Sequence, residues 1–226
     1  MTPTRPRASS LRRTSWLFMT AIAIASLPQA VQAYQTTAAE YHAMETPVGE
    51  IYALFTPDEL HAGGYTFVEI IYAAPLADYA NVQAAGATAT DFFDANVMVA
   101  DVYSLYTPSE LHDGGYPFVE IINASPGTDF VDIHTAGATA TDFFDASVMI
   151  ADVYSLYTPS ELHDGGYPFG EIINTAPLAD YGGIHTAGAT ATDFFDANAM
   201  IADVYSLYTP GELHDGGYSF GQIIGT

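Results

Sequence analysis

The chain contains no cysteine and, after Arg13, no lysine or arginine. The absence of cysteine excludes disulfides, thiolate metal ligands and cysteine nucleophiles. Beyond position 13 there is therefore no Lys or Arg with which the chain could neutralise phosphates. This argues against nucleic acid and anionic membrane surfaces as direct partners. Cations and basic proteins are the favoured partners instead.

Long apolar runs are also missing, and the one apolar stretch near the N-terminus is shorter than a typical membrane span. It runs from Trp16 to Leu27, follows the only four arginines and precedes the small residues Ala30 and Ala33. This order predicts a secretory signal peptide, residues 1–33, cut after Ala33, with an uncleaved anchor as the alternative. We therefore expect export to the periplasm, the cell surface or the extracellular medium.

The mature chain, residues 34–226, carries all 27 Asp and Glu and no Lys or Arg, which gives a formal charge of −27. Strong acidity accompanies disorder only when hydrophobicity is low. Here 49% of the residues are hydrophobic, including 16 Tyr and 13 Phe, so enough apolar surface is present for a core. We expect a folded chain.

A 51-residue period dominates the sequence. His61, His112, His163 and His214 are spaced by it, and an Ala-Gly-Ala-Thr-Ala-Thr-Asp-Phe-Phe-Asp segment recurs at the same interval. The modules cover approximately residues 34–84, 85–135, 136–186 and 187–226. Fixed-period similarity is typical of stacked supersecondary units, so 34–226 is predicted to be a single repeat domain.

Each module divides further into five units of about ten residues, and each unit has a marker position. Sixteen of the nineteen markers are Asp or Glu. The markers are residues 40, 50, 59, 69, 81, 91, 101, 110, 120, 132, 142, 152, 161, 171, 183, 193, 203, 212 and 222.

Helix-capping chemistry gives the markers a physical role. Thr107-Pro108-Ser109-Glu110 has the order of a capping box with Pro at the first helical position, and Gly or Pro follows within a few residues. Within the module, the exception is 139–154, where no Gly or Pro interrupts, which leaves one longer helix or two staggered ones open. We predict an all-α solenoid of one- to two-turn helices, with a β-solenoid as the alternative. Its core should contain Leu111, Ile121, Ile122, Phe143, Phe144, Val153 and Tyr154.

The segments Ala-Gly-Ala-Thr-Ala-Thr-Asp-Phe and Gly-Gly-Tyr-Pro-Phe-Val-Glu-Ile resemble short bacterial repeats of the type A-G-[FY]-[ST]-x-x-[DE]-[LF]. The resemblance covers roughly residues 37–225. It implies an array of small helices and no particular activity.

The candidate metal ligands are the His-Asp pairs that precede Gly-Gly. Oxygen ligands on Gly-rich turns suit Ca²⁺ or another divalent cation, and His beside Asp suits Zn²⁺ or Cu²⁺. The alternative favoured for the histidines is that each ends a short helix, where positive charge interacts favourably with the helix dipole. The pairs are His112 and Asp113, His163 and Asp164, and His214 and Asp215.

These features predict an exported, acidic structural or interaction module associated with cations or a basic protein. An envelope protein that binds or buffers metal through the repeated His and Asp is the alternative. A hydrolase is disfavoured, because no catalytic signature breaks the repeat symmetry, so we expect no enzyme activity. Self-association through exposed solenoid ends is a further expectation.

Overall fold

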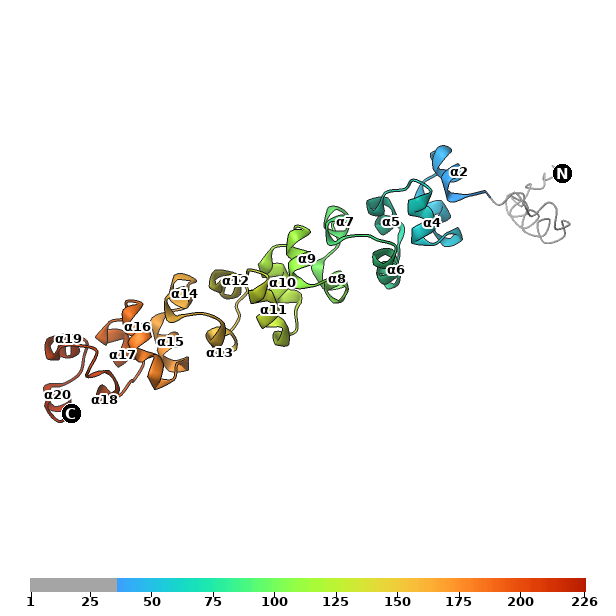
Figure 1. Ribbon diagram of the computed structural model, residues 1–226. Coiled ribbons are helices and arrows are strands. Elements are labelled where there is room, and N and C mark those ends of the chain that lie inside the picture. Colours follow the sequence, from blue (N-terminus) through green and yellow to red (C-terminus); the bar gives the residue numbers. More distant parts are fainter. Residues whose placement is uncertain (1–35) are drawn as a thin grey trace, which may run out of the picture.

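The computed structural model describes residues 36–226, so the predicted signal peptide, residues 1–33, lies outside the described part. The described chain is a rod of short helices, with α2 and α20 at opposite ends (Figure 1). Residues 36–226 contain no strand, so the α-solenoid prediction is confirmed and the β-solenoid alternative is wrong. Within the same range no helix has the length and apolarity that crossing a bilayer requires.

Every marker position predicted from the sequence is the third residue of one α-helix. These helices are α2 (Ala38–Ala43), α3 (Val48–Ile51), α4 (Pro57–Ala62), α5 (Phe67–Ala73), α6 (Tyr79–Ala84), α7 (Ala89–Asp94), α8 (Val99–Val102), α9 (Pro108–Asp113), α10 (Phe118–Ala124), α11 (Phe130–Thr135), α12 (Ala140–Asp145), α13 (Ile150–Val153), α14 (Pro159–Asp164), α15 (Phe169–Thr175), α16 (Tyr181–Thr186), α17 (Ala191–Asp196), α18 (Ile201–Val204), α19 (Pro210–Asp215) and α20 (Phe220–Ile224).

Single 3₁₀ turns extend the helices at two places in the module. They are η1 (Tyr52–Leu54), η2 (Leu76–Asp78), η3 (Tyr103–Leu105), η4 (Gly127–Asp129), η5 (Tyr154–Leu156) and η6 (Leu178–Asp180). The turns η1, η3 and η5 follow the four-residue helices α3, α8 and α13, and the other three precede α6, α11 and α16.

The segment 139–154 forms two helices, α12 and α13, and not one. The backbone oxygen of Phe143 accepts a hydrogen bond from the N–H of Val148 at 3.0 Å, and that of Phe144 accepts one from the N–H of Ser147 at 2.8 Å. This pair of hydrogen bonds closes many helix C-termini. Ser147 adopts the left-handed conformation, φ 60°, that this closure requires. Asn96 and Asn198 do the same at the matching positions. The break is therefore made by Ser or Asn, without Gly or Pro.

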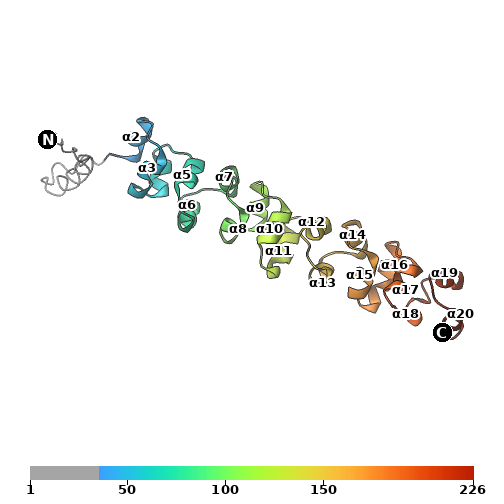
Figure 2. The ribbon, with the colours of Figure 1, turned by 180° about the vertical axis from the view of Figure 1, so that it is seen from behind.

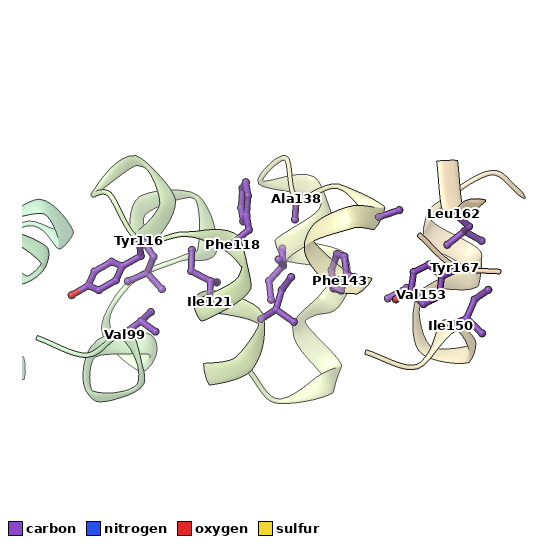
Figure 3. Close-up of a cluster of buried hydrophobic side chains, with 14 of the residues drawn as sticks. Val99, Tyr116, Phe118, Ile121, Ala138, Phe143, Ile150, Val153, Leu162 and Tyr167 are labelled. Carbon is purple, nitrogen blue, oxygen red and sulfur yellow. The ribbon is translucent and has the colours of Figure 1, made fainter. Parts of the chain in front are cut away.

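The core consists mainly of the residue that follows each marker. Leu111, Ile121, Phe143, Val153 and their equivalents are buried, except for the half-buried Tyr41 in the first module, and buried side chains follow one another along the rod (Figure 3). Ile122 is also buried as predicted and Tyr154 is half-buried. The prediction for Phe144 is wrong, because its ring is 42% exposed. Phe143 occupies the inward position, and Phe144 lies about 100° further round the helix.

Most helices pack against the helix two positions on, and about half of the consecutive helices also pack against each other, which gives two intertwined rows. A module has five helices, an odd number, so a given slot changes row in the next module. Nevertheless α8, α13 and α18, which share one slot, all lie on the lower side of the rod in both views (Figures 1 and 2). The rows therefore exchange sides about once per module. With packed helices 8–10 Å apart, a slot recurs every ~20–25 Å.

Candidate functional site

The predicted His-Asp pairs lie at the C-terminal ends of α9, α14 and α19. The Nδ1 atom of His112 is 3.2 Å from the backbone oxygen of Tyr116, and its ring stacks on Phe118 with centroids 3.8 Å apart. His163 makes the same contacts with Tyr167 and Phe169. His214 makes them with Tyr218 and Phe220. Each of these histidines thus has one ring nitrogen and one ring face occupied within its own module.

The neighbouring carboxylates do not complete a coordination shell. Asp113, Asp164 and Asp215 are exposed. Within residues 36–226, no three or more His, Asp or Glu side chains gather in a way that would hold a metal ion. Structural and catalytic zinc usually need three or four ligands from the protein. The structure thus brings together only the two neighbours of each pair, and metal binding by these residues stays a prediction.

The marker carboxylates divide into two sets. In nine helices the carboxylate at the marker position accepts a hydrogen bond from the backbone N–H of the N-cap Thr. The hydroxyl of that Thr accepts a hydrogen bond from the backbone N–H of the acid, and the two bonds together form a capping box. These acids are Glu40, Glu59, Glu69, Asp91, Glu110, Asp142, Glu161, Asp193 and Glu212. Hydrogen bonds from the backbone N–H and the hydroxyl of Thr107 lower the pKa of Glu110.

The other seven marker acids have no capping hydroxyl, because the N-cap residue is Pro, Met or an unengaged Asp. They are Glu50, Asp101, Glu120, Asp132, Asp152, Glu171 and Asp203. Capping explains the first set of acids. It does not explain this second set, whose carboxylates are open to other partners.

One uncapped acid borders a surface hollow of about 510 Å³, which we call the Met–Phe hollow. Its lining includes Phe93, Asp94, Asn96, Met98, Tyr116 and Glu120. An equivalent hollow of about 400 Å³ lies around Phe195, Met200 and Tyr218. The matching residues of the module between them are Phe144, Met149, Tyr167 and Glu171.

Apolar side chains are unusually exposed at this hollow. Met98, Met149 and Met200 are 68–71% exposed, and Phe93, Phe144 and Phe195 are 40–42% exposed. Scattered apolar residues on a surface need no explanation, but a Met and a Phe that recur together in three modules form a candidate contact surface. Methionine suits such surfaces because its side chain is flexible and polarisable.

The hollow is held in shape by neighbouring helices. The buried Tyr116 donates its hydroxyl to the backbone oxygen of Val97 at 2.9 Å, which fixes the turn that presents Met98. Figure 3 shows the Tyr116 oxygen turned away from Phe118. Phe93 packs edge-on against Tyr116, with centroids 5.2 Å apart. Gly115 leaves room for that ring, because a Cβ there would lie 2.8 Å from it.

The modules are unequal at this site. In the first, His42 and Pro47 occupy the places of Phe93 and Met98, and Glu69 is capped by Thr66. In the last, Phe195 and Met200 are present, but Gln222 replaces the acid and is capped by Ser219. Only the two middle modules combine Met, Phe and an uncapped Glu. Their N-cap residues, Pro117 and Pro168, carry no hydroxyl.

Sequence reasoning missed the hollow, although Met98, Met149 and Met200 are 51 residues apart. No family model, no curated protein and no solved structure matches the chain, so the hollow cannot be compared with a site of known function.

Proposed function

We propose that the mature chain is an exported interaction module: an acidic rod that concentrates cations and binds a basic protein through several equivalent weak contacts. The observation that carries this proposal is the second set of marker acids. These carboxylates are not used in capping boxes, and residues 36–226 contain no Lys or Arg that could pair with them.

The geometry supports multivalent and not single-site binding. Equivalent slots recur every ~20–25 Å along a rod of packed helices. A flexible basic partner that reaches two modules gains affinity from effective concentration, without any new kind of contact. The proposal assigns no catalytic role to the chain.

Titration calorimetry of residues 34–226 with poly-L-lysine tests the electrostatic part. We expect binding at low salt that weakens steeply as sodium chloride is added, because exposed charges are screened. A longer polymer that reaches two modules should bind more tightly per lysine than a short one. The absence of binding to either polymer at low salt would rule the proposal out.

Cation association has its own test. Unneutralised like charge opposes compaction, so Ca²⁺ or Mg²⁺ should raise the melting temperature more than sodium at equal ionic strength. If calcium, magnesium and sodium all leave the melting temperature unchanged, charge neutralisation plays no part in the fold.

A further inference from the structure

We propose that the Met–Phe hollow beside Glu120, and the equivalent surface around Phe144, Met149 and Glu171 in the next module, are docking sites for extended segments of the basic partner in which Lys or Arg alternates with apolar side chains. This inference rests on the proposed function and names the chemistry of the partner. Two complete sites are assigned, one at Phe93, Met98 and Glu120 and the other at Phe144, Met149 and Glu171.

Charge decides which occupant fits. The lining of the hollow combines the apolar side chains of Phe93 and Met98 with two carboxylates, those of Asp94 and Glu120. Residues 36–226 contain no Lys or Arg, so no positively charged side chain of those types from this part of the chain can neutralise them. A purely apolar occupant would leave these carboxylates desolvated and unpaired, which is costly. A segment with a cation beside an apolar side chain satisfies both parts of the surface.

A basic side chain can contact the methionine, the carboxylate and the phenylalanine ring of the site together. A Lys or Arg side chain can lay its methylene groups along Met98 and its charged end near Glu120. The exposed face of Phe93 also attracts a cation through its ring electrons. Because Tyr116 holds the turn before Met98 in place, the site is preformed and little ordering is needed when a segment binds.

The absence of an N-cap hydroxyl keeps the carboxylate of each site available to a cation. Thr66 in the first module and Ser219 in the last engage the residue at the marker position, whereas Pro117 and Pro168 leave Glu120 and Glu171 free. Replacing these prolines by threonine would complete capping boxes and tie up both carboxylates. That change alters no charge.

The test compares two peptides of equal length and charge, one of alternating Lys and Leu and one of alternating Lys and Ser. Calorimetry with residues 34–226 should give tighter binding of the Lys–Leu peptide. Met98→Ala with Met149→Ala should weaken that binding by about tenfold, the effect of losing roughly 1.4 kcal/mol of apolar burial, and should weaken binding of the Lys–Ser peptide less, because there only the lysine methylene groups contact the methionines. Leu76→Ala with Leu178→Ala is the control, since these leucines are exposed elsewhere on the module.

Two further variant pairs separate position from charge. Glu120→Gln with Glu171→Gln should weaken both peptides more than Glu50→Gln with Asp132→Asn, which removes two uncapped carboxylates outside the hollow. Pro117→Thr with Pro168→Thr should weaken binding at unchanged net charge. Circular dichroism of each variant checks that the helices are retained.

The outcomes separate the two proposals. If the Lys–Leu and Lys–Ser peptides bind equally and the methionine and proline variants bind as the parent does, the hollows are not docking sites, while the acidic module stands. If neither peptide binds at low salt, the proposed function fails as well.

Discussion

Truncation of one axial leucine tests whether the rod is stabilised locally. Leu162 follows the marker acid of α14 and is fully buried, as are Leu60, Leu111 and Leu213 at the same slot. Because α14 packs against α12, α15 and α16, shortening this side chain leaves a cavity shared by four helices. We expect Leu162→Ala to lower the free energy of unfolding by about 2–5 kcal/mol.

The loss should be confined to neighbours of α14. In a solenoid, stability is approximately a sum of unit and nearest-neighbour contributions. Hydrogen exchange should therefore show reduced protection from α12 to α16 and parent-like protection from α4 to α7. Leu213→Ala makes the same chemical change in α19, which packs against α17 and α20 near the end of the described chain. It should loosen only that end.

Two results would refute this reasoning. Uniform loss of protection from α2 to α20 in Leu162→Ala would mean that the rod unfolds as one unit, and unchanged protection in α12–α16 would mean that the packing is wrong. Leu178→Ala is the matched control, because Leu178 is exposed in η6 and its truncation should change stability by less than about 0.5 kcal/mol.

Three further predictions concern backbone, pH and assembly. Ser147→Gly should stabilise the protein by up to about 1 kcal/mol, because Ser147 holds φ 60°, and Ser147→Val should destabilise it; the melting temperatures of the two variants must move in opposite directions. Hydrogen bonds from the backbone and hydroxyl of Thr158 lower the pKa of Glu161, so their stabilisation is complete above the ordinary carboxyl pKa and is lost as pH falls through the lowered value. Thr158→Ala should therefore cost about 1 kcal/mol at pH 7 and less in acid, and a cost independent of pH in urea titrations would contradict this. Ile224 is 83% exposed, whereas its equivalents Ile71, Ile122 and Ile173 are buried. Ile224→Asp should therefore reduce any concentration-dependent light scattering of residues 34–226. Unchanged scattering would exclude this end of the rod as a contact between copies.

The helix positions were predictable because capping chemistry is local. A Thr and an acid three residues later lie within one turn, so their spacing alone places the start of a helix. The end of α12 was not predictable in the same way. Ser147 adopts a left-handed conformation that Gly adopts far more readily, and nothing in its immediate sequence demands it. Its closure depends on Val148 returning to the Phe143 carbonyl.

The candidate site was less predictable because it lies between helices. Phe93 belongs to α7, Met98 to the following turn and Glu120 to α10, so no short motif contains all three. Sequence reasoning directed attention to His112 and Asp113, which are adjacent and conspicuous. It passed over the methionines, whose preceding turns are each held from another helix by a tyrosine hydroxyl, that of Tyr116, Tyr167 or Tyr218.

The two prolines at the N-caps of α10 and α15 connect stability with the proposed function. A hydroxyl at that position contributes about 1 kcal/mol, and the first and last modules both have one. Proline recovers part of that stabilisation by restricting the unfolded chain, so the fold tolerates the exchange. The exchange removes the hydrogen bond that would otherwise engage the carboxylates of Glu120 and Glu171. These are the same two modules in which an exposed Met and Phe accompany the Glu. Functional sites are expected where a protein departs from local rules such as helix capping, especially where several departures lie close together. The middle modules are therefore the place to look for the partner, and the capped ends supply the internal control.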